Sequence, residues 1–399
     1  MTARHWLESL LDSGIRPGLE RMRAVLRPLG DPHRAYASIL VAGTNGKGST
    51  AATLASILDA SGYRTGLYTS PHLVDIRERW MIGREPAGEA LFEESIETLR
   101  RASESIGIRP TYFEALTLIA FIVFERTRRE IAVLEVGMGG RLDATNVVRP
   151  IAALITPVGL DHMEYLGNTL TRIATEKAGV IHRGAVVLTS NRDPKIVSVL
   201  RRRAASFDCP FEVVPPGGKA TPLRGEFQRD NAALAARAAE MLRKRLPKIT
   251  SESIERGLQA TTWRGRLERL DVAGKECWVD GCHNTHAARA VAPFISANVA
   301  TPRLLVFGIM RDKDVREVAA ILFPLFDRVI TTEPYPPRSV EAAALADVAA
   351  EMGVPARAAA DPREALAAAL ASEVRALFVG GSLYLAGAAI EFLDQARKG

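Results

Sequence analysis

Cysteine is scarce in this sequence, and long apolar runs are absent. The 399 residues include three cysteines, with no CxxC pair and an odd total, which argues against a disulfide framework or a zinc cluster. No stretch approaches the roughly 18 consecutive apolar residues that span a bilayer, and the first residues lack the basic and then apolar pattern of a secretory signal. We therefore expect a cytoplasmic protein with no membrane partner.

An excess of one charge sign is present but small. Lys and Arg exceed Asp and Glu, and the formal net charge is +6, so the surface field mildly favours anionic ligands such as nucleotides and carboxylates. Nucleic-acid binders concentrate basic residues on one face, whereas here they are scattered along the chain apart from short runs such as Arg201 to Arg203. We expect no nucleic-acid partner.

The alternation of apolar and amphipathic segments predicts an α/β fold. Amphipathic segments of helical period, such as Glu89 to Arg101 and Thr117 to Arg128, lie between short runs rich in Val, Ile and Leu. The clearest runs are Ser38 to Gly43, Ile131 to Gly137, Ile151 to Pro157 and Ala185 to Ser190. This pattern is typical of a mostly parallel sheet with crossover helices.

The same pattern restarts after Trp263, which predicts a second and smaller α/β domain. We expect an N-terminal domain at residues 1–267 and a C-terminal domain at residues 268–399, joined after a Pro- and Gly-rich loop at Val213 to Arg224. Strands of the second domain are expected at Leu267 to Asp271, Glu276 to Asp280, Arg303 to Phe307, Arg328 to Thr332 and Ala376 to Val379.

A glycine-rich turn follows the first apolar run and precedes an amphipathic segment. Glycines let backbone amides converge on phosphate oxygens, a helix N-terminus adds favourable partial charge, and Lys47 can reach the outer phosphates. The expected ATP contacts are Gly43, Thr44, Asn45, Gly46, Lys47, Gly48, Ser49 and Thr50, with Ser49 or Thr50 on magnesium. The alternative is a tight turn with an exposed lysine, because Gly48 separates Lys47 from Ser49 and breaks the GxxxxGK[ST] pattern. The strand on one side and the helix on the other favour the phosphate interpretation.

Three further polar residues each have an ordinary structural interpretation when they are taken alone. Glu135 ends an apolar strand, where open α/β sheets place their ligands, and could hold a hard cation or pair with an arginine. His162 follows another such strand and could be an ordinary hydrogen-bonding loop residue. Lys177 lies in a short helical segment and, by composition and spacing, is a solvated cation.

The order of the motifs resembles the Mur ligase superfamily and, within it, the folylpolyglutamate synthase and dihydrofolate synthase family. The resemblance rests on the Gly43 to Ser49 run, on Tyr68-Thr-Ser-Pro-His-Leu73, and on a colinear series of shorter matches. That series comprises Gly18 to Met22, Glu78-Arg79, Thr111 to Glu114, Glu135 to Asn146, Asp161-His162, Glu176 to Gly179, Gly265 to Glu268, Asp280-Gly281, His283-Asn284, Phe307-Gly308, Asp312 to Asp314 and Gly381 to Tyr384. It implies an N-terminal P-loop ATPase domain of Mur-ligase type and a Rossmann-like C-terminal glutamate-ligase domain.

The resemblance also implies an activity and a set of site residues. The activity is ATP-dependent ligation of L-glutamate to a folate or dihydropteroate carboxylate through an acyl phosphate, and we expect a monomer. Catalytic roles fall to Lys47, His162 and a carbamoylated Lys177. The implied metal ligands for Mg2+ are Ser49, Ser70, Glu135, His162 and Lys177, and a histidine ligand would also suit Mn2+. Further nucleotide contacts are implied for Asn231, Arg266, Asp280 and His283, and substrate contacts for Pro71, His72, Arg79, Phe113, Glu114, Arg338 and Ser382.

Three departures from the family pattern lie near these motifs. Arg264 and Thr285 stand where relatives commonly have Pro, and Cys282 stands where they have Ala, which we interpret as a small buried residue. Two other functions were weighed, a catalytically inactive nucleotide-binding regulator and a nucleic-acid-dependent P-loop ATPase. The first would have lost phosphate or metal ligands, yet they are all present. The second would show hydrolysis stimulated by polynucleotides.

Overall fold

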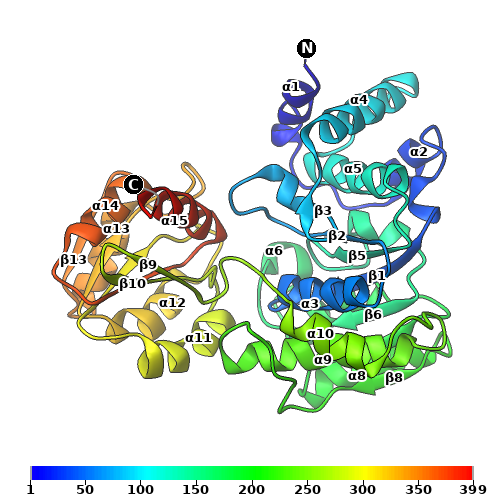
Figure 1. Ribbon diagram of the computed structural model, residues 1–399. Helices are drawn as coiled ribbons and strands as arrows, with labels where there is room; N and C mark the ends of the chain where they lie inside the picture. Colours follow the sequence, from blue (N-terminus) through cyan, green and yellow to red (C-terminus); the bar gives the residue numbers. More distant parts are fainter. Residues whose placement is uncertain (1, 398–399) are drawn as a thin grey trace. The chain divides into compact units, whose positions relative to one another are not determined.

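The computed structural model describes residues 2–397, which form two compact units (Figure 1). The first unit contains the described residues up to Ser70, then Arg77–Pro222 and Gln228–Thr262; the second contains Pro71–Ile76, Leu223–Phe227 and the described residues from Trp263 onward. The chain therefore enters the second unit three times. Two short segments, Pro71–Ile76 and Leu223–Phe227, pack with the C-terminal part of the sequence.

The first unit is built on an eight-stranded sheet in the order β4-β3-β2-β5-β1-β6-β7-β8. Its strands are β1 (Ala37–Ala42), β2 (Thr65–Tyr68), β3 (Trp80–Ile82), β4 (Glu85–Pro86), β5 (Ile131–Glu135), β6 (Ala152–Ile155), β7 (Val186–Thr189) and β8 (Phe211–Val213). Six of them are parallel, and only β3 and β4 add antiparallel pairing at one edge. Every residue of β5, β6 and β7 is buried, which explains why these strands read as continuous apolar runs.

Helices lie between these strands along the chain, as crossover connections require. They are α1 (Ala3–Glu8), α2 (Glu20–Leu26), α3 (Lys47–Ala60), α4 (Glu89–Ser105), α5 (Tyr112–Arg126), α6 (Met163–Leu166), α7 (Leu170–Ala178), α8 (Pro194–Ala205), α9 (Glu226–Leu242) and α10 (Ser251–Gln259), with 3-10 turns η1 (Leu11–Ser13), η2 (Pro32–Arg34), η3 (Ile76–Arg79) and η4 (Ala144–Val147). The predicted mostly parallel α/β architecture is confirmed.

Helix α3 is buried along nearly its whole length, because it packs between α10 and the strands β2 and β5. A β-carbon at Gly257 of α10 would lie 2.3 Å from Ile57 Cα, so only glycine permits this approach of the two backbones. Ser56 donates a hydrogen bond to the Gly257 carbonyl at 2.7 Å. The helix that begins at Lys47 is thereby held rigidly in place.

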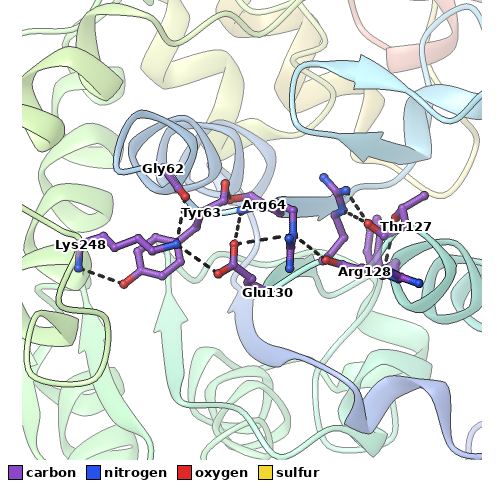
Figure 2. A network of polar contacts seen from close by, with 10 residues as sticks. Gly62, Tyr63, Arg64, Thr127, Arg128, Glu130 and Lys248 are labelled. Atoms are coloured by element: carbon purple, nitrogen blue, oxygen red, sulfur yellow. Dashed lines mark hydrogen bonds and ion pairs between the residues drawn. The ribbon is translucent and has the colours of Figure 1, made fainter.

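A polar network joins the amino ends of β2 and β5 (Figure 2). The Glu130 carboxylate accepts hydrogen bonds from the Arg64 amide at 2.8 Å and from Lys248 Nζ at 3.2 Å. Lys248 Nζ also donates to the Gly62 carbonyl, and Arg64 Nε donates to the Arg128 carbonyl. The Arg64 amide and Lys248 lower the pKa of Glu130. The Glu130 carboxylate therefore stays ionised, and its negative charge balances the basic residues at the starts of these strands.

The second unit has a six-stranded sheet in the order β13-β12-β11-β14-β10-β9, parallel except for β9. Its elements are β9 (Glu268–Val272), β10 (Lys275–Val279), α11 (Thr285–Asn298), β11 (Arg303–Phe307), α12 (Val315–Leu322), η5 (Phe323–Leu325), β12 (Arg328–Thr331), α13 (Ala342–Glu351), β13 (Ala356–Ala358), α14 (Pro362–Ala371), β14 (Ala376–Gly380) and α15 (Leu383–Ala396). Leu305 and Phe307 of β11 face one hydrophobic core, whereas Leu304 and Val306 face another. Helices on both faces of the sheet produce this alternation.

No helix among residues 2–397 combines the length and hydropathy needed to cross a bilayer. The three cysteines are free and buried. Burial raises the pKa of the Cys282 thiol well above its usual value, which opposes thiolate formation and agrees with the interpretation of Cys282 as a packing residue.

Candidate functional site

The glycine-rich turn connects β1 to α3 in a conformation that requires glycine. Gly43 has φ +147° and Gly46 has φ +84°. A β-carbon at Gly43 would lie 1.8 Å from Thr156 Oγ1, and one at Gly46 would lie 2.5 Å from Asn231 Oδ1. The structure therefore brings Asn231 of α9 directly against the turn, as expected for a residue of the same site.

The first turn of α3 offers donors that suit phosphate oxygens. Lys47 begins the helix and donates from Nζ to the Thr44 carbonyl at 3.0 Å. Ser49 is 2% exposed, and the Thr50 hydroxyl oxygen is buried without a hydrogen-bond partner. A buried hydroxyl of this kind carries a free-energy cost unless a ligand or water satisfies it. These features fit a bound phosphate chain with its metal ion.

Thr44 ties the turn to the loop that follows β6. Its hydroxyl donates to the Gly159 carbonyl and accepts from the Gly159 amide, both at 3.0 Å. The buried Asn191 side chain accepts from the Val158 amide at 2.8 Å and donates to the Thr156 carbonyl at 2.9 Å. Asn191 was not singled out in the sequence, because no motif marks it. The loop carrying His162 is thus anchored to the glycine-rich turn at Gly43.

Lys177 contacts the same turn from α7. The side chain is almost fully buried, and Nζ donates to the Gly43 carbonyl at 2.7 Å. Burial, and secondarily the positive charge of Lys47, lower the pKa of Lys177 to about 7. The solvated-cation interpretation of Lys177 is therefore wrong: a large fraction of this amine is neutral at neutral pH.

Glu135 and Ser70 meet at the carboxyl ends of β5 and β2. Glu135 is the last residue of β5 and is 5% exposed, and its Oε2 accepts from the Ser70 amide at 3.1 Å. His162 has φ +49° and precedes α6, with Nε2 4.0 Å from Asp161 Oδ1. Within residues 2–397, no three His, Cys, Asp or Glu side chains gather into a metal-ligand group. A metal at Glu135 would therefore need oxygen ligands of other kinds.

Phe113 and Glu114 are positioned by the start of α5. Thr111 and Glu114 form a reciprocal capping box, and Arg21 forms an ion pair with Glu114 at 2.9 Å. The Phe113 ring packs so closely on Gly137 that a β-carbon there would lie 2.2 Å away. An aromatic ring held in this way offers a flat surface, as a planar heterocycle requires.

Asp143 lies in the loop that Gly137 opens. It is 7% exposed and accepts hydrogen bonds from the Met138 amide at 2.9 Å and the Thr145 hydroxyl at 2.6 Å. Burial raises its pKa. Arg79, another expected substrate contact, is 7% exposed, and its carbonyl accepts from the Thr69 amide. Asp143 was part of a quoted motif but received no role from the sequence, and it is a further buried carboxylate of this loop.

Gln228 is a second residue that the sequence did not mark. It is 1% exposed, its Oε1 accepts from Asn231 Nδ2 at 3.0 Å, and its own Nε2 has no partner. The position of Gln228 three residues before Asn231, on the same face of α9, is the signal that could have identified it. An unpaired buried amide beside Asn231 suits an acceptor on a bound ligand.

Asp280 and His283 lie in the loop after β10 in the second unit. Asp280 is 3% exposed and accepts from the Leu267 amide at 2.9 Å and the Cys282 amide at 2.8 Å. Burial raises the pKa of Asp280, and the nearby Arg266 opposes that shift. His283 Nδ1 lies 2.8 Å from the Gly281 carbonyl, so Nδ1 carries a proton and donates to that oxygen.

The departures at Arg264 and Thr285 are accommodated by polar contacts. Arg264 forms ion pairs with Glu268 and Asp394, both at 2.8 Å, and Thr285 donates to Glu317 at 2.9 Å. The residues that relatives carry as prolines are thus held by side-chain interactions instead of by a fixed φ.

Ser382 and Arg338 also belong to the second unit. Ser382 is 1% exposed and caps α15 by accepting from the Tyr384 amide. The Tyr384 ring stacks on Tyr335 with centroids 4.8 Å apart, and the Arg338 guanidinium lies 5.8 Å from the Tyr335 centroid. Pro71 and His72 fall in the short segment that packs with this unit, whereas Ser70 and Arg79 belong to the first unit.

Comparison with known proteins assigns the family. The model of the Mur ligase middle domain matches residues 41–239, and that of the Mur ligase glutamate ligase domain matches residues 265–387. A Bacillus subtilis dihydrofolate synthase/folylpolyglutamate synthase is 34% identical over 78% of this chain and 80% of its own length. The chain belongs to the folylpolyglutamate synthase/dihydrofolate synthase family of the Mur ligase superfamily.

Solved structures of family members agree with this assignment over the whole chain. A Mycobacterium tuberculosis folylpolyglutamate synthase complexed with ADP has a TM-score of 0.88 and 32% identity, covering 98% of this chain and 97% of its own. Escherichia coli FolC in complex with DHPP and ADP has a TM-score of 0.87 and 28% identity, covering 100% and 99%. The predicted family and fold class are confirmed, and the nucleic-acid-dependent ATPase and the inactive regulator are not favoured.

Proposed function

We propose that this protein catalyses ATP-dependent amide formation between L-glutamate and the carboxylate of a folate-type acid. Membership of a family of ligases and the site around the Gly43 turn support the proposal together. The observation that carries it is the contact of Lys177 with Gly43, because it places a partly neutral amine against the phosphate-binding turn. A passive nucleotide-binding loop has no need of such a residue.

The proposed reaction overcomes the resistance of a carboxylate to attack by an amine. A carboxylate oxygen of the folate-type acid attacks the γ-phosphorus of ATP, the bond to the bridging oxygen breaks, and ADP leaves. The neutral glutamate amine then attacks the carbonyl carbon of the acyl phosphate, phosphate leaves, and the nitrogen loses one proton and keeps the other as the amide N–H. Lys47 and the amides of the Gly43 turn stabilise the negative charge on the phosphate oxygens. Positioning of the reactants lowers the entropic part of the barrier.

The metal site is proposed from oxygen-rich residues of the first unit. Ser49, Ser70, Glu135, His162 and Lys177 would hold Mg2+, and Mn2+ would also suit the histidine. The buried hydroxyls of the first turn of α3 and the oriented Glu135 carboxylate fit a hard cation. When bound, the ion would neutralise charge on the phosphates. Ser49 and Glu135 supply the oxygen atoms whose placement the fold itself determines.

Carbamoylation of Lys177 would supply a second anionic oxygen ligand beside the Glu135 carboxylate. The neutral Nζ attacks the carbon of CO2, a proton leaves the nitrogen, and a carbamate anion results. Two observations support this step: the pKa of Lys177 is lowered to about 7, and the described residues contain no three-member group of His, Cys, Asp and Glu. A permanent ammonium there would instead repel a cation.

Substrate and further nucleotide contacts are proposed for both units. Aromatic and polar residues around α5 and η3, with the segment that follows Ser70, would bind the pterin-bearing acid. These are Pro71, His72, Arg79, Phe113 and Glu114. Arg338 and Ser382 would bind L-glutamate, and Asn231, Arg266, Asp280 and His283 would contact ATP. In the division proposed here, residues 1–267 bind the nucleotide and residues 268–399 serve as the glutamate-ligase domain.

We also propose a monomeric cytoplasmic enzyme without a nucleic-acid partner. The three free cysteines suit a reducing compartment. Sedimentation of the purified chain at several concentrations would test the oligomeric state.

A substrate panel tests the proposed activity. ADP and phosphate release from ATP are measured with glutamate alone, with dihydropteroate or tetrahydrofolate alone, and with each acid plus glutamate. Turnover is expected only when an acid and glutamate are present together, and the acid that supports it identifies the acceptor. Equal hydrolysis without either substrate, or stimulation by DNA or RNA, would contradict the ligase assignment.

A further inference from the structure

Asn146 makes three hydrogen bonds that together determine the orientation of its amide. It lies in η4 and is 5% exposed. Its Nδ2 donates to the Arg141 carbonyl and to the Gly179 carbonyl, both at 3.1 Å. Carbonyl oxygens only accept, so the nitrogen must face them and Oδ1 must face His182, whose Nε2 lies 2.8 Å away. His182 therefore donates from a protonated Nε2.

The two carbonyls bound by Asn146 belong to segments that pack backbone against backbone. A β-carbon at Gly179 would lie 2.4 Å from Arg141 Cα, and one at Gly140 would lie 2.8 Å from the Glu176 carbonyl oxygen. The Arg141 amide donates to the same Glu176 carbonyl at 2.8 Å. Because the backbones are in close contact, a displacement of the loop at Gly140 and Arg141 would also move the end of α7.

The end of α7 carries Lys177, which reaches the nucleotide turn. Gly179 follows α7 directly, and Lys177 Nζ bonds the Gly43 carbonyl at 2.7 Å. A continuous path of hydrogen bonds and backbone contacts therefore runs from His182 through Asn146 and α7 to Gly43. His182 is five positions beyond Lys177 in sequence but does not touch the turn in any contact described above.

The surroundings of His182 keep it neutral and in place. It is partly buried, and burial, with smaller contributions from Arg203 and Arg149, lowers its pKa. Its carbonyl accepts a hydrogen bond from the Cys209 thiol at 3.1 Å. A neutral imidazole has one N–H, and the geometry around Asn146 requires that hydrogen on Nε2.

We infer that His182 is a positioning residue of the ligase reaction: its Nε2–H orients the Asn146 amide, which locks the end of α7 and so places Lys177 against the nucleotide turn. The inference rests on the proposed role of Lys177 for its effect on catalysis. The hydrogen-bond path itself does not depend on that role.

Two substitutions of His182 test whether its Nε2–H is required. His182→Leu removes the N–H and leaves Asn146 Oδ1 buried without a partner, so Lys177 is held less firmly and kcat should fall about tenfold. KM for ATP should change little, because the turn itself is intact. His182→Gln restores an N–H at a similar reach and should recover kcat to within about threefold of the wild type. A general loss of stability is monitored by the melting temperature, expected to fall by no more than about 4 °C.

A double-mutant cycle tests whether His182 acts through Asn146. In an Asn146→Ala background the partner of His182 is gone, so His182→Leu should have no further effect on kcat. Additive losses in the double variant would overturn the inference. So would failure of His182→Gln to recover activity, or a wild-type kcat in His182→Leu.

Hydrogen exchange separates this inference from the proposed chemistry. The amides of Gly179 and Val180, bonded to carbonyls of α7, should exchange faster in His182→Leu than in His182→Gln, with no substrate added. Unchanged exchange overturns the positioning role whatever Lys177 does. Faster exchange in His182→Leu with a wild-type kcat would also overturn the positioning role. If Lys177→Ala loses activity in that case, the proposed function still stands.

Discussion

At the scale of single residues, Lys177 shows how burial changes chemistry. Its pKa is lowered to about 7 from an unfolded value of 10.5, so the folded protein binds fewer protons than the unfolded chain between these values. The stability contribution of this group therefore rises with pH across that window. We expect Lys177→Met to melt at a higher temperature than the wild type at pH 7, with the difference narrowing toward pH 10. A difference independent of pH would contradict the lowered pKa.

The proposed carbamate on Lys177 has its own test. Lys177→Ala should lose most activity, and a small carboxylic acid added to the assay should partly restore it by filling the vacated anion position. Lys177→Arg should not be active, because guanidinium stays cationic and does not take up CO2. A carbon-13 signal from enzyme prepared with labelled bicarbonate measures the carbamate directly. A free ammonium in fully active, metal-loaded enzyme would refute this role.

Glu135 and Glu130 lie at opposite ends of β5, so Glu130→Gln is a matched control for Glu135→Gln. Glu135→Gln keeps the shape of the side chain but removes one anionic ligand, so the Mg2+ concentration for half-maximal activity should rise by roughly tenfold. Glu130→Gln, at the opposite end beside Arg64 and Lys248, should leave that titration unchanged. Equal curves for wild type and Glu135→Gln would make Glu135 a structural residue.

At the scale of elements, the packing of α3 on α10 controls where the phosphate-binding turn lies. Gly257→Ala would place a β-carbon 2.3 Å from Ile57 Cα and 2.7 Å from its nitrogen, and backbone atoms cannot move aside locally. We expect a loss of stability of roughly 1–3 kcal/mol and a higher Kd for ADP, since α3 begins at Lys47.

The control for this element is Gly88→Ala. Gly88 is the N-cap of α4 with φ −62°, and a β-carbon there has open space, so Gly88→Ala should cost only the loss of a favourable N-cap residue, about 0.5–1 kcal/mol, and should leave the Kd for ADP unchanged. If the two alanine variants unfold alike, close packing of α3 on α10 is not what requires glycine at position 257.

At the scale of the whole molecule, one group of basic residues lies at the amino edge of the first sheet. An arginine lies within the three residues that precede five of the six parallel strands of the first sheet, namely β2, β5, β1, β6 and β7. They are Arg34, Arg64, Arg128, Arg129, Arg149 and Arg183. Arg245 donates to the carbonyls of Ile151 and Gly184, and Lys248 reaches Glu130 (Figure 2). The amino edge of the first sheet therefore carries a cluster of basic side chains.

Like charges at one edge repel each other, so a multivalent anion should stabilise the first unit. At equal ionic strength, phosphate should raise the melting temperature more than chloride, because it binds the clustered arginines only in the folded state. Phosphate also stabilises proteins by exclusion from their surfaces. The variant Arg128→Gln with Arg149→Gln isolates the site-bound part, which should shrink. An unchanged phosphate effect in this variant would show that the arginines at the strand starts do not bind phosphate.

The sequence by itself determined the fold class, the family and the glycine-rich turn between a strand and a helix. Continuous apolar runs identify buried parallel strands because both faces of such a sheet are covered, and Gly43 to Ser49 lies in one local segment whose geometry depends on its own glycines. Short strands such as β3 and β13 were not predicted, because three residues are too few to show an alternating pattern.

Only the tertiary structure decided the rest. The lowered pKa of Lys177 arises from burial and from Lys47, residues 130 positions apart. Asn231 at Gly46, Asn146 at Gly179 and the arginines at the strand starts are likewise brought together by strand order and helix packing. Hydrophobic patterning records which face of an element is buried, whereas burial energy and charge interactions depend on which elements become neighbours.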